Sequence, residues 1–312
     1  MLNSHLTAHL DQALRTAGEI ILGKERELRL ALTCLLARGH LLIEDLPGVG
    51  KTTLAHLLAR LLGLEYARIQ FTSDLLPADI IGASIYERAT ERFRFHPGPL
   101  FAELVLADEI NRATPKAQSA LLEAMEERQV TVEGETHPLP QPFFVIATQN
   151  PTTQIGTFPL PESQLDRFLM RLRIGYPAVA AEKALLAGED RRDMLARLEP
   201  VLDRTQILAL QMAVGQVHAA PPIIDYCYDI IAFTRAAPSF VQGLSPRAGL
   251  ALLRAARAWA LLAGRDLVYP EDLQAILGPC VSHRLEIVPN DERGLGLVAE
   301  AASLILEQVP VR

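Results

Sequence analysis

The sequence predicts an α/β domain with a parallel five-stranded sheet flanked by helices, followed by a smaller all-helical domain. In the first half of the 312-residue chain, short apolar runs of strand length alternate with segments of helical periodicity. That alternation is typical of a parallel sheet covered by helices on both faces. Beyond about residue 177 strand-like runs almost disappear, and helical patterns follow one another. We therefore expect one domain over residues 1–177 and a second over residues 178–312.

The expected strands are rich in β-branched or aromatic residues, and the expected helices of the second domain are punctuated by prolines. A helical spacing of leucines follows the first strand, at Leu54, Leu57, Leu58 and Leu61. The expected strands span 40–45, 66–71, 104–108, 143–149 and 168–174. The expected helices of the second domain span 180–188, 205–218, 223–236, 245–263, 270–277 and 292–308.

Composition limits the classes of protein to which the chain can belong. Hydrophobic residues make up 49%, and the mean hydropathy is +0.17, so the chain can bury a sizeable core. The net charge of −7 argues against a free-standing nucleic-acid-binding protein, which usually carries a basic stripe. Isolated Cys34, Cys227 and Cys280 indicate neither a metal site nor a disulfide. The amino terminus lacks a signal-peptide pattern, and arginines interrupt the longest apolar tract, so we expect no membrane insertion and a cytoplasmic location.

A glycine-rich turn between the first strand and the following helix carries the strongest functional signal. The strict phosphate-loop pattern requires glycine at position 45, where this chain has Asp45, but that position lies before the amides that wrap a phosphate. An ordinary glycine-rich turn is the alternative. A strand before the turn and a helix after it favour the phosphate loop, because a helix amino terminus attracts anions. We expect nucleotide contacts from Pro47, Gly48, Val49, Gly50, Lys51, Thr52 and Thr53.

Within this turn, the residue types match the chemistry of a nucleoside triphosphate. Gly48 and Gly50 allow close approach of the backbone to phosphate, and Pro47 stiffens the turn. Lys51 is expected to meet the β- and γ-phosphates, and the Thr52 hydroxyl is expected to contact Mg²⁺.

An acidic pair follows the third expected strand. Asp108, at the exit of the apolar run LVLA, is expected to hold Mg²⁺ through water. Glu109 is placed to orient and deprotonate the attacking water. Phosphoryl transfer needs a bound metal ion, a positioned water and added positive charge. In this interpretation Asp108 helps to hold the metal ion and Glu109 positions the water.

Three polar residues further along the chain are candidates for nucleotide contacts. The amide of Asn150 is suited to hold the attacking water or the γ-phosphate, although an Asx turn before Pro151 explains the same pattern. Arg167 fits either a surface ion pair or a finger for a neighbour's γ-phosphate. Arg247 lies in the first turn of a helix that Ser245 caps, where the helix dipole disfavours a cation unless an anion is near. A solvated Arg247 is the alternative.

Together, five segments resemble the MoxR family of AAA+ ATPases, and the likeness extends over about residues 18–290. The segments are IEDLPGVGKT (43–52), VLADEINRATPKAQSALLEAMEERQVTV (105–132), ATQNP (147–151), FPLPESQLDRF (158–168) and GLSPRAGLALLRAARAWA (243–260). Asp45 looks usual for this family. The resemblance implies that Lys51 and Thr52 are the Walker A pair and that Asp108 and Glu109 are the Walker B pair, with ATP and Mg²⁺ as cofactors.

The resemblance also implies roles for single residues outside these pairs. Asn150 is similar to sensor 1, and Arg247 is similar to sensor 2. Arg167 resembles the arginine finger, with Arg171 and Arg173 as alternatives for that role. Gly23 is similar to the glycine at the turn that packs against adenine.

Assembly and partners enter through the resemblance alone. Proteins of this kind form rings, expected here to be hexamers of the chain, in which hydrolysis moves the helical domain against the α/β domain. A partner with a von Willebrand factor A domain is implied, as are client complexes that are matured, assembled or loaded with a cofactor. The insertion 71–103 and the hairpin 128–142 have the proline and glycine punctuation of exposed loops, and they are expected to face the central pore or a client.

Three alternatives to a chaperone-like motor are open on the sequence. A magnesium-chelatase-like motor subunit carries closely related motifs. A small-molecule kinase would use the same phosphate loop, but the helical second domain and the segment QLDRF disfavour it. A scaffold that binds nucleotide without hydrolysis would not need Glu109 and Asn150, which this chain has.

Overall fold

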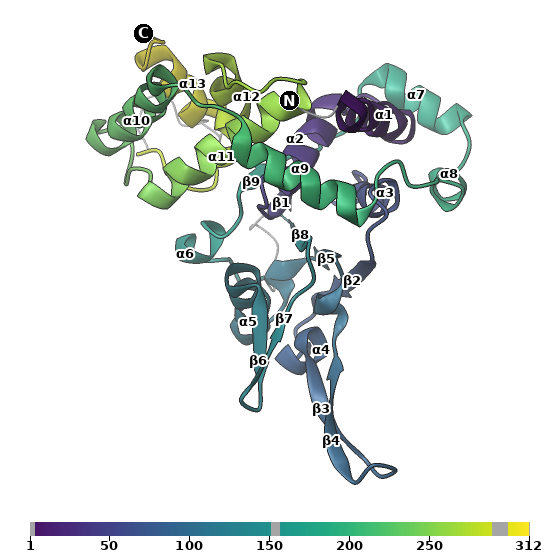
Figure 1. Cartoon of the computed structure of the whole chain (residues 1–312). Helices are drawn as coiled ribbons and strands as arrows, with labels where there is room; N and C mark the ends of the chain where they lie inside the picture. The colour runs from purple at the N-terminus through teal and green to yellow at the C-terminus, as the bar shows by residue number, and fades with distance from the viewer. Residues whose placement is uncertain (1–3, 151–156, 289–298, 312) are drawn as a thin grey trace.

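A parallel sheet of five strands forms the centre of the structure, a computed structural model that describes residues 4–150, 157–288 and 299–311 (Figure 1). The strands lie in the order β2-β5-β8-β1-β9, and each neighbouring pair is parallel. The five predicted strands are thereby confirmed. Because the strands are parallel, the segments that follow β1, β5 and β8 meet at one edge of the sheet. The strands are β1 Leu41–Glu44, β2 Tyr66–Gln70, β5 Leu104–Asp108, β8 Phe144–Gln149 and β9 Met170–Leu172.

Side chains of the strands alternate between two buried faces. In β1, Leu41 and Ile43 pack with α2 and α3, whereas Leu42 packs on the opposite face with α5. All three side chains are fully buried, as expected for a parallel sheet with helices on both sides. The covering helices are α2 Glu25–Leu36, α3 Lys51–Leu61 and α5 Pro115–Glu127.

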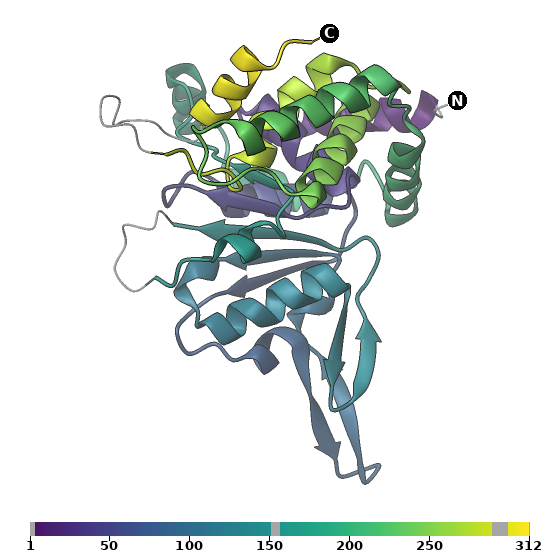
Figure 2. The same cartoon turned by 90° about the vertical axis from the view of Figure 1, so that its left-hand side faces the viewer.

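The part of the chain after β9 is helical, as predicted. It packs over the end of the molecule that also carries both termini (Figures 1 and 2). One continuous apolar cluster joins these helices to α1 and α2, so the boundary at residue 177 stays a prediction. The helices are α1 Ser4–Ile20, α7 Val179–Ala187, α8 Arg191–Ala196, α9 Arg204–Gln216, α10 Pro221–Ala236, α11 Pro246–Leu262, α12 Pro270–Val281 and α13 Ala299–Gln308. Of the helix predicted over 292–308, residues 292–298 lie outside the described residues.

The insertion 71–103 forms regular structure instead of the predicted exposed loop. Two runs rich in aromatic and β-branched residues pair as the antiparallel strands β3 and β4, after the short helix α4. At Gly82 a Cβ atom would lie 2.2 Å from the carbonyl oxygen of His96, so the hairpin base requires glycine. Both hairpins project from the body on the side away from the C-terminal helices (Figures 1 and 2). These elements are α4 Pro77–Ile81, β3 Gly82–Glu87, β4 Arg92–Pro97, β6 Gln129–Val132 and β7 Glu135–Pro138.

The short helix α6 Glu162–Leu165 precedes β9. Two short 3-10 helices, η1 Pro99–Phe101 before β5 and η2 Ile110–Arg112 after it, complete the helices and strands of the described ranges. Within the described ranges, no helix is both long enough and apolar enough to cross a bilayer.

A buried histidine supports the amino end of β1. His40 Nδ1 accepts a hydrogen bond from the backbone N–H of Val145 at 3.0 Å. Burial, reinforced by the nearby charge of Arg128, lowers the pKa of His40 to about 4. His40 is therefore neutral in the folded protein at pH values at which an exposed histidine is already protonated.

Acidification is expected to destabilise the fold through this residue. The folded-state pKa lies below the unfolded value of about 6.5, so the contribution of His40 is fully present above that pH and is lost as the pH falls towards 4. It amounts to about 3 kcal/mol of unfolding free energy. His40→Asn keeps an acceptor for Val145 and removes the titration. Urea denaturation between pH 7 and pH 4 should therefore give a flatter stability profile for this variant. Parallel profiles for the two proteins would contradict the assignment.

Candidate functional site

The turn between β1 and α3 has the backbone conformation that its glycines allow. Gly48 has φ +85° and Gly50 has φ +94°, in the left-handed region that favours glycine. A Cβ atom at either position would meet no other protein atom within 4 Å. The left-handed backbone, and not crowding by the protein, therefore explains glycine at these positions. Gly50 leads directly into α3, so the free N–H groups of the first helical turn border the loop.

Lys51 is the first residue of α3, and its side chain turns into the molecule. Its Nζ donates to the carbonyl oxygen of Asp45 at 2.7 Å and to Asn150 Oδ1 at 3.4 Å. Burial lowers the pKa of Lys51, while the charges of Asp45, Asp108 and Glu109 act in the opposite direction. The structure thus holds a cation between the glycine-rich turn and the end of β8.

Asp45 links the turn to the segment that follows β9. Its Oδ2 accepts a hydrogen bond from the N–H of Gly175 at 2.6 Å, and its Oδ1 accepts one from the N–H of Leu46 at 2.8 Å. Gly175 has φ +66°, so glycine is also favoured at the position that donates this hydrogen bond. The residue that departs from the strict phosphate-loop pattern therefore connects the loop to the chain leading into the helical region.

The acidic pair is fixed by one hydroxyl group. Asp108 is the last residue of β5, and Glu109 follows in the left-handed region with φ +57°. The hydroxyl of Thr148 donates to Asp108 Oδ1 at 2.6 Å and accepts from the backbone N–H of Glu109 at 2.8 Å. The other oxygen of Asp108, Oδ2, accepts from Arg68 Nη2 at 2.6 Å. Both acids therefore have defined positions beside the end of β8.

Three donors hold the carboxylate of Glu109. Its Oε1 accepts from Asn150 Nδ2 at 2.9 Å, and its Oε2 accepts from Arg112 at 2.9 Å and from Gln70 Nε2 at 3.2 Å. Asn150 itself is buried, and it touches both Lys51 and Glu109. The structure thus brings together four of the residues singled out in the sequence: Lys51, Asp108, Glu109 and Asn150. Pro151, the basis of the Asx-turn alternative, lies outside the described residues.

Arg68 and Gln70 belong to this cluster, although no sequence motif marks them. Both lie on β2, next to β5, and Gln70 is in register with Asp108. They alternate along the strand and share one face of it. Their alternate spacing near the end of a strand is a sequence pattern that could have indicated a functional role. Only the pairing of β2 with β5 shows that Arg68 meets Asp108 and that Gln70 meets Glu109.

The donor set at this edge is suited to a hard cation. Thr52 is exposed in the first turn of α3, and Asp108 supplies a carboxylate, so hydroxyl and carboxylate oxygens are both present. Within the described ranges, no group of three histidine, cysteine or acidic side chains is arranged to hold a metal ion. A magnesium site here therefore depends on oxygens from a bound phosphate, consistent with its usual coordination.

Arg167 and Arg247 lie together at the opposite edge of the sheet. Arg167 Nη2 is 3.1 Å from Glu126 Oε2, and Arg247 pairs with the other oxygen of the same carboxylate. The hydrogen bond from Arg247, with the charge of Arg167, lowers the pKa of Glu126. The two arginines line a cavity with Gly39 and His40, which precede β1, whereas the phosphate-loop residues follow it. The structure therefore does not bring either arginine to the Lys51 cluster of its own chain.

The two alternatives to Arg167 have different surroundings. Arg171 is 12% exposed, lies 3.0 Å from Glu44 Oε2 and also bonds to Ser282. Arg173 is 49% exposed and lies 3.8 Å from the same oxygen of Glu44. Arg171 is thus committed within the chain, whereas Arg167 remains 28% exposed at the surface beside Glu126.

Gly23 is connected to the glycine-rich turn indirectly, through the segment after β9. It has φ +69° in the turn between α1 and α2, and a Cβ atom there would come within 3.5 Å of Ala181 in α7. The neighbouring Lys24 donates from Nζ to the carbonyl oxygen of Tyr176 at 3.1 Å. Tyr176 follows Gly175, which Asp45 holds, so the Gly23 turn is connected to the loop through this segment.

Comparison with known proteins gives consistent matches along the chain. Residues 40–170 match a family model described as "ATPase family associated with various cellular activities (AAA)", and residues 232–304 match a model described as an AAA lid domain. The chain is 47% identical to the uncharacterised protein YeaC of Bacillus subtilis, over 94% of this chain and 91% of that protein. It is 40% identical to the chaperone MoxR1 of Mycobacterium tuberculosis, over 88% of this chain and 75% of that protein.

A solved structure has the same architecture. The crystal structure of a candidate ATPase from Cytophaga hutchinsonii superposes with a TM-score of 0.88 at 32% sequence identity. The match covers 98% of this chain and 96% of the other. The likeness therefore includes both the sheet and the helical region.

The link made by Asp45 can be tested by its removal. Asp45→Ala is expected to lower the free energy of unfolding by about 1–3 kcal/mol, because two hydrogen bonds to a charged group are lost. Asp79→Ala is the control, since its carboxylate accepts a single local hydrogen bond, from the N–H of Leu76 at the start of the short helix α4. Chemical denaturation measures both variants. An effect of Asp45→Ala no larger than that of Asp79→Ala would contradict a structural role for the link to Gly175.

Proposed function

The chain belongs to the MoxR family of AAA+ ATPases, and from that membership we propose that it hydrolyses ATP with Mg²⁺ in a ring and uses the cycle to remodel client protein complexes. One observation carries the proposal. Lys51, the Asp108–Glu109 pair and Asn150 meet at the carboxyl edge of the sheet, joined by hydrogen bonds. Ligands of open α/β sheets bind at this edge.

Each side chain of the cluster has a distinct part in the proposed reaction. Lys51 and the backbone N–H groups of the loop bind the phosphates, and Asn150 orients the γ-phosphate or the attacking water. Thr52 and Asp108 would hold Mg²⁺, which would supply positive charge near the phosphates during transfer. Glu109 orients and deprotonates the attacking water. Its carboxylate accepts from three donors, one on Oε1 and two on Oε2, which leaves an acceptor site on Oε1 for the attacking water.

The position of the arginines supports an assembly in which subunits share their sites. Arg167 and Arg247 cannot serve the loop of their own chain from the amino edge of the sheet. In a closed ring, expected to be a hexamer, this edge would face the loop of the adjacent subunit, and both arginines would reach its γ-phosphate. We propose Arg167 as the arginine finger and Arg247 as a second contact to the same neighbour.

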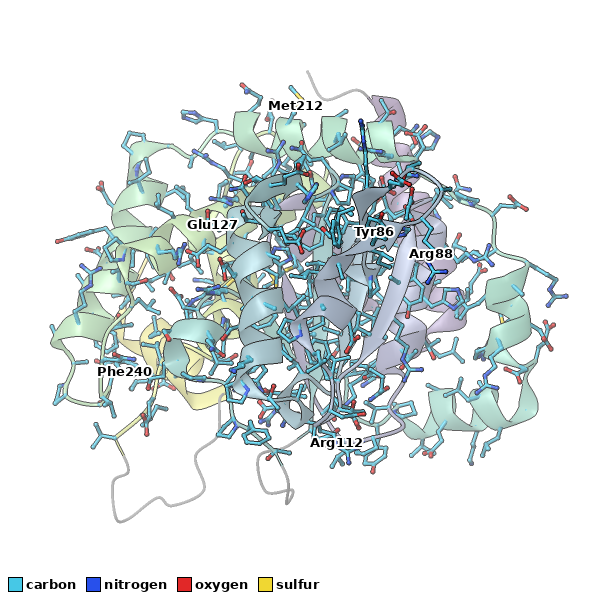
Figure 3. All side chains as sticks on the ribbon, turned by 90° about the horizontal axis from the view of Figure 1, so that it is seen from below. Tyr86, Arg88, Arg112, Glu127, Met212 and Phe240 are labelled. Atoms are coloured by element: carbon cyan, nitrogen blue, oxygen red, sulfur yellow. The ribbon has the colours of Figure 1, made fainter. Side chains whose placement is uncertain are left out.

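The projecting hairpins are the proposed contact with clients. Figure 3 views the molecule from the side on which they project, with Tyr86 and Arg88 of the β3–β4 hairpin labelled. Tyr86 is 50% exposed and Phe93 is 69% exposed, and their rings lie 5.4 Å apart. Exposed aromatic side chains on a projecting hairpin are suited to transient contact with protein. The family resemblance further supports a partner with a von Willebrand factor A domain and clients that include complexes awaiting cofactor insertion.

Separate variants distinguish nucleotide binding from hydrolysis. Lys51→Ala is expected to weaken ATP binding by about tenfold or more, since it removes a charge-assisted contact to phosphate. Glu109→Gln is expected to keep binding and to lower turnover by about 10²–10⁴-fold, because the general base is lost. Titration calorimetry and phosphate release measure the two effects, with the exposed Lys116→Ala as the control. Turnover of Glu109→Gln at the wild-type rate would refute the proposed hydrolysis.

Mixing inactive variants tests whether subunits share their sites. Arg167→Ala is expected to bind ATP but to lose turnover by about 10³-fold or more, the range reported for arginine fingers. The Lys51→Ala variant keeps Arg167 but has an inactive phosphate loop. In a ring that mixes the two variants, some interfaces therefore combine an intact loop from Arg167→Ala with an intact Arg167 from Lys51→Ala. Such rings should recover part of the activity. A mixture of Lys51→Ala with Glu109→Gln is the control, because both lesions lie on the same side of the interface and no complete site can form. A mixture of Arg167→Ala and Lys51→Ala that gains nothing over its components would overturn the shared site.

A further inference from the structure

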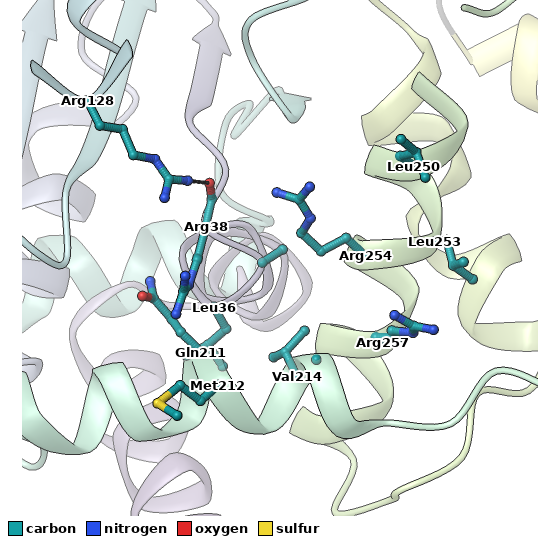
Figure 4. Close-up of a pocket in the computed structure, with 12 residues that line it drawn as sticks. Leu36, Arg38, Arg128, Gln211, Met212, Val214, Leu250, Leu253, Arg254 and Arg257 are labelled. Atoms are coloured by element: carbon teal, nitrogen blue, oxygen red, sulfur yellow. Dashed lines mark hydrogen bonds between the residues drawn. The ribbon is translucent and has the colours of Figure 1, made fainter. Parts of the chain in front are cut away.

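Four arginines line a cleft that the proposed ATPase cycle does not use. Arg38, Arg128, Arg254 and Arg257 surround a cavity of about 650 Å³ between the ends of α2 and α5 and the helices α9 and α11. In Figure 4, Arg254 extends from α11 towards Arg38 and Arg128, and a hydrogen bond joins Arg128 to the carbonyl oxygen of Arg38. Apolar side chains, including Leu36 and Leu250, form part of the wall.

In the described part of the chain, no acidic side chain forms an ion pair with any of these arginines. No carboxylate lies within 4.0 Å of any of the four, counted over residues 4–150, 157–288 and 299–311, although acids outnumber lysines and arginines by 37 to 30. By contrast, Arg68 pairs with an acid in the Lys51 cluster, and Arg167 pairs with Glu126. The Nε atom of Arg257 is buried without a hydrogen-bond partner. An anion from outside the chain would compensate this group of charges.

Helix ends explain only two of the four positions. Arg38 follows the C-cap of α2, and Arg128 is the C-cap of α5, where a cation interacts favourably with the helix dipole. Arg254 and Arg257 lie in the interior of α11, three residues apart on one face, where like charges destabilise a helix. Burial lowers the pKa of Arg128, and the charges of Arg38 and Arg254 lower it further. The four arginines thus repel one another, and the favourable helix-end positions of two of them do not offset this repulsion.

We propose that this arginine cleft is a second anion site, which binds a polyphosphate group. Four guanidinium groups match an anion with several negative charges better than a single carboxylate, and their planar forks bind phosphate oxygens in pairs. The cavity also has the volume of an ordinary small-molecule pocket. The cleft lies near the residues that precede β1, whereas Lys51 follows β1, so the two sites are separate. This inference is independent of the proposed hydrolysis.

The polyphosphate has two possible sources. It is either a free nucleotide or polyphosphate in solution, or the triphosphate held by a neighbouring copy of the chain. The second source is consistent with the adjoining cavity, which shares Arg38, Arg128 and Arg254 with the cleft and also contains Arg167 and Arg247.

Titration calorimetry with inorganic tripolyphosphate tests the cleft in a background that lacks the phosphate-loop lysine. The two proteins compared are Lys51→Ala and the same protein with Arg38→Asn and Arg254→Gln. Asparagine tolerates the positive φ of +54° at position 38, so the second protein should fold. We expect tripolyphosphate to bind the first protein and to bind the second at least about tenfold more weakly.

A control variant distinguishes the loss of the cleft arginines from a general loss of positive charge. Lys51→Ala combined with Arg94→Gln and Arg197→Gln loses the same two charges at side chains that are 72% and 66% exposed elsewhere, and it should bind as Lys51→Ala does. Lys51→Ala with Arg254→Lys keeps the charge but loses the fork, and it should show an intermediate affinity. Absence of binding to Lys51→Ala, or equal affinity with and without Arg38 and Arg254, would overturn the proposal.

A second experiment distinguishes a neighbour's triphosphate from a free polyphosphate as the ligand of the cleft. In a chain with an intact phosphate loop, Arg38→Asn with Arg254→Gln should reduce ATP-dependent assembly, measured by light scattering, if the cleft binds a neighbour's triphosphate. Unchanged assembly together with weakened tripolyphosphate binding would assign the cleft to a free ligand.

Discussion

A buried amine holds the candidate site together. Lys51 Nζ donates to the carbonyl oxygen of Asp45 and to Asn150, and the charges of Asp45, Asp108 and Glu109 oppose the effect of its burial on its pKa. A buried cation is stable only with such compensation. The contacts of this amine therefore tie the glycine-rich turn after β1 to the end of β8, and Asn150 in turn bonds to Glu109 after β5. Phosphate oxygens would provide stronger compensation than the carbonyl group that Lys51 now contacts.

The parallel sheet separates two kinds of charged residue. Its carboxyl edge collects the lysine and the acidic pair, whereas its amino edge collects Arg167, Arg247 and the arginines of the cleft. A single chain cannot bring the two edges together, because the strands lie between them. This separation supports the proposed ring, in which the amino edge of one subunit would face the carboxyl edge of the next.

Local sequence was sufficient for the strands, the glycine-rich turn and the cap at Ser245, because propensity, periodicity and capping act over a few residues. It also identified Lys51, Asp108, Glu109 and Asn150, since each ends a strand, directly follows one or begins a helix. The link from Asp45 to Gly175 joins residues far apart in sequence, and only the folded chain reveals it. Arg68 and Gln70 depend on the pairing of β2 with β5, and the place of Arg247 depends on how α11 packs. The β3–β4 hairpin was missed because proline and glycine flank its two strands.

A crystal structure with a nonhydrolysable ATP analogue and Mg²⁺ tests the central claim most directly. The account predicts a triphosphate enclosed by residues 47–53, with Lys51 Nζ on its phosphates in place of the Asp45 carbonyl oxygen and with Glu109 facing the γ-phosphate. An analogue bound elsewhere, with Lys51 still on Asp45 and the turn contacting no phosphate, would contradict it.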